Sequence, residues 1–172
     1  MLRTRCMSRG FVKEDDQEET PIIPPRAALP DEAINYVTEN GLALLKTEKE
    51  ELSNEIANLT ESDERERRRA LAVLNGKLNL LQERLASARL LDTVENKNEV
   101  RFGAAVVYEI DGKSKQRIQI VGVDEADIKK RKIAFTAPIA QALMGKEVGE
   151  IAELRLGSAD LRELKVLEIS YS

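Results

Sequence analysis

The feature that most constrains this chain is a change in the period of its apolar residues near residue 100. Before it, apolar residues recur in alternating steps of three and four, which is typical of the contact face of a coiled-coil helix; these are Leu71, Leu74, Leu78, Leu81, Leu85 and Ala88. From Val100 onward, apolar and polar residues alternate, which is the period of a β-strand. A chain of 172 residues with one such change predicts an α+β protein with a helical part followed by a sheet domain.

Another helix is predicted before these leucines in the sequence. Apolar spacings of three, four and seven begin after Thr38, at Leu42, Leu45, Leu52, Ile56 and Leu59. Between the two helices, Thr60 or Ser62 can accept hydrogen bonds from the free N–H groups of a helix start. We therefore expect a long antiparallel coiled-coil hairpin over residues 34–91, whose second helix is about 40 Å long at 1.5 Å per residue. A parallel coiled-coil dimer is the alternative, and the turn residues favour the hairpin and a monomer.

Residues 92–172 predict a small antiparallel sheet domain with one short helix. We expect strands over residues 101–110, 116–122, 132–136, 151–156 and 162–171. Asp111 and Gly112 suit the turn between the first two strands. Pro138 near its start and Gly145 after its end bound the helix, over residues 138–144.

Composition excludes several classes of protein. The chain has no His and one Cys, which excludes His-based catalysis and disulfide frameworks and argues against zinc sites. Apolar runs are shorter than the roughly 20 residues of a membrane helix, so we expect a cytoplasmic protein without membrane contact. The net charge of -4 argues against binding nucleic acid through the overall field. Residues 1–33 combine a charge run with prolines and predict a disordered acidic, Pro-rich arm.

Three segments of the sheet domain carry a resemblance to a known family. They are residues 100–104, then 120–127 with the pattern Gly-x-Asp-Glu-Ala-Asp, then Pro138-Ile139-Ala140 followed by Leu143, Gly145 and Lys146. In this order they resemble the C-terminal domain of the bacterial Gre (GreA/GreB) transcript-cleavage factors, over about residues 92–171. The family's usual Ser before that Pro is Ala137 here.

The resemblance implies a fold and a partner. The sheet domain would be FKBP-like and would bind core RNA polymerase at the rim of its secondary channel, while the hairpin enters the channel. The residues that match the family's motifs, and so are expected at the polymerase contact, are Asp124, Glu125, Asp127, Pro138 and Ile139. The protein would act by modifying the polymerase active site and would not itself be an enzyme.

The resemblance also implies a role for acidic residues at the hairpin tip. In the family they help the polymerase hold a second Mg²⁺ and a water, so that backtracked RNA is cut. The candidates here are Glu61, Asp63 and Glu64, although the same residues also suit the start of a helix. No metal or other cofactor is expected in the isolated protein, because the Mg²⁺ is shared only in the polymerase complex.

The tip departs from the family in composition and reach. Asn58 stands where the family has Asp, and the hairpin is shorter by about two turns per helix, or about 10 Å. The arginines that follow the tip can contact the phosphates at the 3′ end of the nascent RNA; they are Arg65, Arg68 and Arg69. Pairing of these arginines with acidic residues on the facing helix, Glu48, Glu51 and Glu55, is the alternative.

These observations predict a bacterial transcription elongation factor that binds RNA polymerase at the secondary channel and stimulates cleavage of backtracked RNA. The alternative is a non-cleaving Gre-like regulator or inhibitor that occupies the same channel. A third possible function, that of an FKBP-type prolyl isomerase or chaperone, is suggested by the fold analogy alone, and fold does not imply function.

Overall fold

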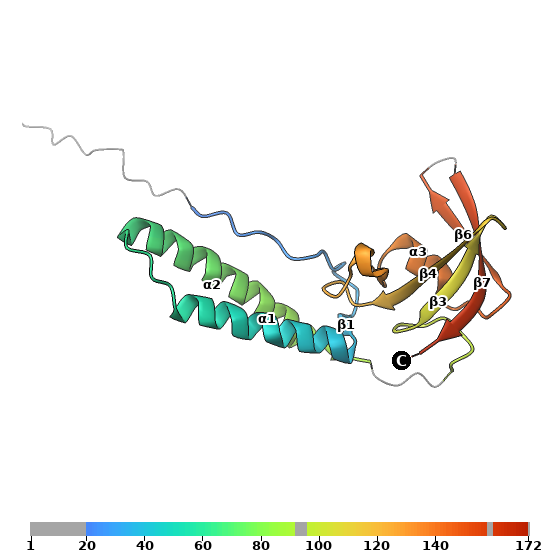
Figure 1. The fold of residues 1–172 in the computed structure, drawn as a ribbon, viewed down its shortest axis with the longest axis horizontal. Helices are drawn as coiled ribbons and strands as arrows, with labels where there is room; N and C mark the ends of the chain where they lie inside the picture. The colour runs from blue at the N-terminus through green and yellow to red at the C-terminus, as the bar shows by residue number, and fades with distance from the viewer. Residues whose placement is uncertain (1–19, 92–95, 158–159, 172) are drawn as a thin grey trace, which may run out of the picture.

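The computed structural model describes residues 20–91, 96–157 and 160–171. A helical hairpin and a curled sheet lie end to end along the long axis of the molecule (Figure 1). The elements follow in the order β1 (Tyr36–Val37), α1 (Glu39–Ala57), α2 (Glu64–Ser87), β2 (Arg89–Leu90), β3 (Ala105–Ile110), β4 (Ser114–Val121), η1 (Ile128–Lys130), β5 (Lys132–Ala134), α3 (Pro138–Leu143), β6 (Ile151–Leu156) and β7 (Asp160–Ser170). The fold is α+β, as the change of period predicts.

Both long helices begin at a side chain that accepts a backbone N–H group. The hydroxyl of Thr38 accepts from the N–H of Gly41 at 2.9 Å, and the carboxylate of Asp63 accepts from the N–H of Glu66 at 2.9 Å. The prediction that Thr60 or Ser62 caps the second helix is therefore wrong. Asp is as good a cap as Ser, and its charge also suits the positive end of the helix.

The two helices pack along one row of leucines. The buried members of this cluster are Val37, Leu45, Leu52, Leu74 and Leu81. Leu81 is fully buried, whereas residues 60–69 at the tip are mostly or wholly exposed. The packing that the leucine spacing indicates is thus present near the base and middle of the hairpin. Supercoiling of the pair stays a prediction.

A two-residue parallel pair closes the base of the hairpin. Tyr36 of β1 lies opposite Arg89 of β2, and Val37 lies opposite Leu90. Beside this pair the buried side chain of Asn35 donates to the carbonyl of Arg84 at 2.9 Å. The segment that leads into α1 and the end of α2 are therefore held together.

The main sheet has the strand order β5-β4-β3-β7-β6. All neighbours are antiparallel except β4 and β5, which are parallel. The expectation of a wholly antiparallel sheet is wrong at this edge, because the chain crosses back through residues 122–131 before it pairs. Strand β3 starts at Ala105 and not at residue 101, since Gly103 has a φ of 87° within a turn.

The core of the sheet domain lies between the sheet and α3. Ile120, Leu143, Leu164 and Val166 are among its fully buried side chains. Ala137 precedes α3 and gives it no side-chain cap, and Pro138 occupies the first turn. An FKBP-like relationship for this domain stays a prediction.

The segment before β1 differs from the disordered arm expected over residues 1–33. From residue 20 onward it runs beside the hairpin towards the sheet domain (Figure 1). Its side chains contact α1, α2 and the loop after β4. Residues 1–19 of the expected arm lie outside the described residues. Across the described ranges, no helix has the length and apolar character needed to cross a membrane.

Candidate functional site at the hairpin tip and its joint to the sheet

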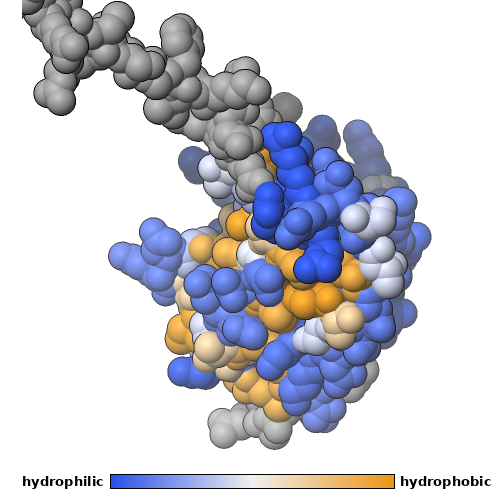
Figure 2. Space-filling model, turned by 90° about the vertical axis from the view of Figure 1, so that its left-hand side faces the viewer, coloured by the Kyte–Doolittle hydropathy of each residue, from blue (hydrophilic) through white to orange (hydrophobic). Residues whose placement is uncertain are grey.

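The three acidic candidates of the tip lie at the end of the hairpin farthest from the sheet. Glu61, Asp63 and Glu64 are all exposed. Figure 2 faces this end of the molecule and shows hydrophilic residues around an apolar area. Within the described residues, no group of three or more acidic, His or Cys side chains is placed to hold a metal ion.

Each of these carboxylates has a local contact. One oxygen of Glu61 accepts from the N–H of Ser62 at 3.0 Å, and Asp63 caps α2. Glu64 lies 4.0 Å from the guanidinium of Arg68, one turn along α2. Glu61 and Asp63 thus accept backbone N–H groups of the turn, as the helix-start interpretation predicts, and all three carboxylates remain exposed to solvent.

Asn58 completes the end of α1. Its side-chain amide donates to the carbonyl of Asn54 at 2.8 Å, and its backbone N–H donates to the same carbonyl at 3.0 Å. The position at which the Gre pattern has an acid therefore carries a neutral group that serves as a helix end.

The arginines that follow the tip lie on the surface of α2. Arg65, Arg68 and Arg69 are exposed, and Arg68 is the one beside Glu64. Of the acids proposed as their partners on α1, Glu48 is paired with Arg26 of the N-terminal segment instead. Contact of these arginines with RNA stays a prediction.

The loop after β4 forms the joint between hairpin and sheet. Gly122 lies against β1, where a Cβ atom would come within 2.7 Å of the carbonyl oxygen of Tyr36. Glu125 is buried, and its carboxylate accepts from the hydroxyl of Thr38, from Asn40 at 2.8 Å and from Lys132 at 2.7 Å. One side chain of the sheet domain thus holds the start of α1 and the start of β5.

The charge of Glu125 is stabilised by these donors. Burial raises the pKa of its carboxyl, but the hydrogen bonds from Lys132, Thr38 and Asn40 together outweigh burial and leave the pKa below its usual range. Glu125 is therefore an ion at neutral pH, and the joint contains a buried ion pair.

Asp124 lies between two guanidinium groups. Its side chain is 8% exposed, with one oxygen 3.2 Å from Nε of Arg84 and the other 2.8 Å from Nη2 of Arg26. Two of the three acids of the Gly-x-Asp-Glu-Ala-Asp pattern, Asp124 and Glu125, therefore face the hairpin. Their expected contact with polymerase stays a prediction, and in this arrangement they hold the two parts of the molecule together.

The other three residues of the predicted polymerase contact are more accessible or lie in the core. Asp127 caps η1 by accepting from the N–H of Lys129 at 3.0 Å, and it lies 3.6 Å from Nζ of Lys130. Pro138 is exposed, whereas Ile139 is half-buried against the sheet core. The structure brings together Asp124 and Glu125 at the joint.

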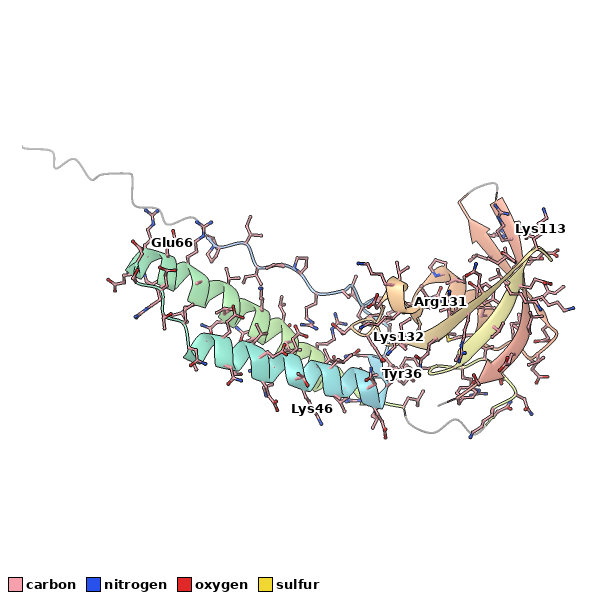
Figure 3. All side chains as sticks on the ribbon, viewed as in Figure 1. Tyr36, Lys46, Glu66, Lys113, Arg131 and Lys132 are labelled. Atoms are coloured by element: carbon pink, nitrogen blue, oxygen red, sulfur yellow. The ribbon has the colours of Figure 1, made fainter. Side chains whose placement is uncertain are left out.

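Sequence reasoning missed the partners of these acids. Thr38, Arg84 and Arg26 meet these two acids from segments distant in sequence, whereas Lys132 meets Glu125 from seven residues away. Figure 3 shows Lys132 and Tyr36 at this junction. The one available signal is that buried acids require cationic partners.

Three aromatic rings also meet at the joint. The ring centroids of Tyr36 and Phe102 are 5.8 Å apart, those of Phe102 and Phe135 are 5.8 Å apart, and those of Tyr36 and Phe135 are 6.1 Å apart. The joint therefore contains a packed aromatic cluster beside its ion pairs.

Comparisons with known proteins agree on one family. The family profile "Transcription elongation factor, GreA/GreB, C-term" matches residues 95–171. The transcription elongation factor GreA of Hyphomonas neptunium is 40% identical over 100 residues, which cover 57% of this chain and 63% of the relative. That of Neorickettsia sennetsu is 38% identical over 122 residues, which cover 69% of this chain and 76% of the relative.

Two solved structures were also matched. The GreA factor homolog 1 protein of Thermus thermophilus is 19% identical, with 80% of this chain and 99% of that one covered, at a TM-score of 0.38. The GreA/GreB elongation factor of Nitrosomonas europaea is 17% identical, with 81% and 99% covered, at a TM-score of 0.40. At these scores the overlaps add nothing to the sequence matches.

Proposed function

Because the chain belongs to the GreA/GreB family of transcription elongation factors, we propose that it binds RNA polymerase at the secondary channel and stimulates cleavage of backtracked RNA. The observation that carries this proposal is the exposure of Glu61, Asp63 and Glu64 at the end of the hairpin farthest from the sheet. A narrow two-helix projection suits entry into a channel whose rim holds the sheet domain.

The proposed chemistry divides the work between two proteins. Carboxylate oxygens are ligands that Mg²⁺ accepts, and a bound Mg²⁺ activates water and stabilises the leaving oxygen of a phosphodiester. The residues that would add oxygens to a cation held by the polymerase are Glu61, Asp63 and Glu64. In this proposal the chain is not an enzyme by itself and carries no cofactor outside the complex.

We assign polymerase binding to the sheet domain. Pro138 and the half-exposed Asp127 offer accessible surface in the arrangement described. Asp124 and Glu125 contribute indirectly, because they hold the hairpin in place relative to the sheet domain that binds the polymerase. A direct contact of these two acids with polymerase requires the hairpin to move away from the sheet.

The test is RNA cleavage in a purified, deliberately backtracked elongation complex. We expect the full chain to stimulate cleavage and at least one of Glu61→Gln, Asp63→Asn and Glu64→Gln to lose that stimulation. Glu66→Gln is the matched control, because Glu66 is an exposed acid of the same turn. Cleavage that survives all three substitutions together would refute the role of the tip. Binding is scored separately, with Pro138→Glu expected to weaken it.

A non-cleaving regulator is the second candidate, and one observation favours it. Asn58 replaces the expected acid and is bound within α1, so it offers no carboxylate at the tip. In the same assay this candidate predicts no stimulation together with slower intrinsic cleavage or slower nucleotide addition. Both candidates require binding to the polymerase, and they differ in the chemistry of the tip.

A further inference from the structure

Arg26, in the segment before β1, contacts both the hairpin and the sheet domain. Its Nη1 and Nη2 atoms donate to the two carboxylate oxygens of Glu48 on α1, at 2.8 and 3.0 Å. Its Nε and Nη2 atoms donate to one oxygen of Asp124 in the loop after β4, at 3.0 and 2.8 Å. The next residue, Ala27, accepts from the guanidinium of Arg84 on α2. Two successive residues therefore link both helices to the sheet domain.

Apart from Glu48, whose side chain is 41% exposed, the groups in these contacts are largely shielded from solvent. The side chain of Arg26 is 18% exposed, that of Arg84 is 11% exposed and that of Asp124 is 8% exposed. The hydrogen bonds use all three nitrogens of the Arg26 guanidinium, a planar group that can serve two carboxylates at once. A Lys side chain at this position keeps the charge but cannot reproduce this geometry.

A second anchor lies three residues earlier. Ile23 packs over Gly76 in the middle of α2, where a Cβ atom would lie 2.2 Å from Cδ1 of Ile23 and 2.7 Å from its Cγ1. Glycine inside a helix is destabilising relative to alanine. The packing of Ile23 explains this glycine, because a Cβ atom at residue 76 forces the Ile23 side chain out of its present position.

We propose that residues 23–27 form a brace that fixes the direction of the hairpin relative to the sheet domain, with Arg26 as a positioning residue for the tip. Without the brace, the joint keeps the Glu125 contact to Thr38 and the ion pair of Arg84 with Asp124, but it loses the link from Glu48 to Asp124. The hairpin then pivots about the remaining contacts. The consequence for cleavage rests on the function proposed above, whereas the geometric claim does not.

The geometric claim is tested by a distance measurement in the full chain. Spin labels are placed at Glu66→Cys and Lys113→Cys in a Cys6→Ser background, because Figure 3 shows Glu66 at the tip and Lys113 at the opposite end of the molecule. Pulsed electron resonance should give a narrow distance distribution. We expect Arg26→Ala, Arg26→Lys and Gly76→Ala to broaden or shift it.

Two of the variants distinguish loss of the brace from a general loss of structure. Gly76→Ala improves the helix propensity of α2, so a wider distribution in that variant cannot come from a weaker helix. Arg67→Ala removes an exposed arginine of α2 and should leave the distribution unchanged. Distributions in Arg26→Ala and Gly76→Ala that equal that of the wild type would overturn the proposal.

A functional readout completes the test. At saturating protein, Arg26→Ala should lower the stimulated cleavage rate by about tenfold or more, because small misplacements of a catalytic group are costly. Binding to polymerase through the sheet domain should be retained. A wild-type chain that never stimulates cleavage refutes the proposed function and leaves the distance result standing. An unchanged distance refutes the brace whatever the cleavage assay shows.

Discussion

Glu125 accepts a hydrogen bond from the hydroxyl of Thr38, and the same hydroxyl oxygen accepts from the N–H of Gly41 at the start of α1. A single oxygen atom therefore serves both the cap of a hairpin helix and the contact with the sheet domain. Lys132 approaches the same carboxylate from β5. Changes at Glu125 should consequently be felt in both parts of the molecule.

Acid should weaken this joint. The folded-state pKa of Glu125 is lowered by its donors despite burial, so its carboxylate contributes stability that is fully present above the unfolded value of about 4.3. That stability is lost as the pH falls through the lower folded pKa. We expect Glu125→Gln to cost about 2 kcal/mol near pH 7, less than a fully buried pair because Lys132 keeps some solvent contact.

The measurement for Glu125 is urea unfolding of wild type and Glu125→Gln from about pH 7 down to about pH 3. The difference between the two free energies of unfolding should shrink as the pH falls below the unfolded value of about 4.3 and on through the lower folded pKa of the wild-type carboxyl. Other carboxylates titrate in both proteins and cancel. A difference that stays constant over this range would contradict the prediction.

The leucine row should set the stability of the hairpin. Leu81 is fully buried, so Leu81→Ala should lower the free energy of unfolding by about 2–5 kcal/mol, through lost burial and the cavity left behind. Leu44→Ala on the exposed side of α1, where the side chain is 52% exposed, should cost less than about 1 kcal/mol. Denaturant midpoints followed by helical circular dichroism check both values.

Asp63 allows its structural and chemical roles to be separated. Asp63→Ala should cost about 1 kcal/mol because the N–H of Glu66 loses its acceptor, whereas Asp63→Asn keeps an acceptor and should cost much less. Thermal unfolding of the two variants tests this order. If the carboxylate itself is needed for cleavage, both variants lose stimulation; if the cap is what matters, Asp63→Asn retains it.

The phenol of Tyr171 links the end of the chain to the start of the sheet domain. Its oxygen accepts from the N–H of Arg101 at 3.0 Å and donates to the carbonyl of Glu99. Tyr171→Phe should therefore cost about 1–2 kcal/mol in the free energy of unfolding. Tyr108→Phe is the control, because Tyr108 packs in the core as an aromatic ring and should tolerate the change. Equal losses in the two variants would argue against the Tyr171 link.

Regular patterns account for the parts of the fold that could be predicted. The steps of three and four predict the packing that buries Leu74 and Leu81, and Asp111-Gly112 lies in the turn between β3 and β4, with positive φ at both residues. Pro138 at the start of α3 and Gly145 just beyond its end likewise act where expected. Each of these signals is local, so the sequence window contains all the interacting residues.

The joint could not be predicted because its contacts are not local. The pairing of β1 with β2 involves two residues on each side, too few to show a period. Burial of Asp124 and Glu125 depends on Arg26, 98 residues away from Asp124, and on Thr38, 87 residues away from Glu125. A Pro-rich segment has no periodicity that would reveal its packing on α2.

The small parallel pair at the base of the hairpin has a mechanical consequence. Helix α2 has 24 residues and is about 36 Å long, so a tilt of about 10° at β1 and β2 displaces its far end by about 6 Å. The base of the hairpin meets the sheet domain through a few contacts, among them those of Tyr36, Thr38 and Arg84, and any small rotation there is amplified along the helices. Small shifts of Tyr36 and Val37 therefore become shifts of several ångströms at the tip. The position of the tip depends on packing at the opposite end of the hairpin.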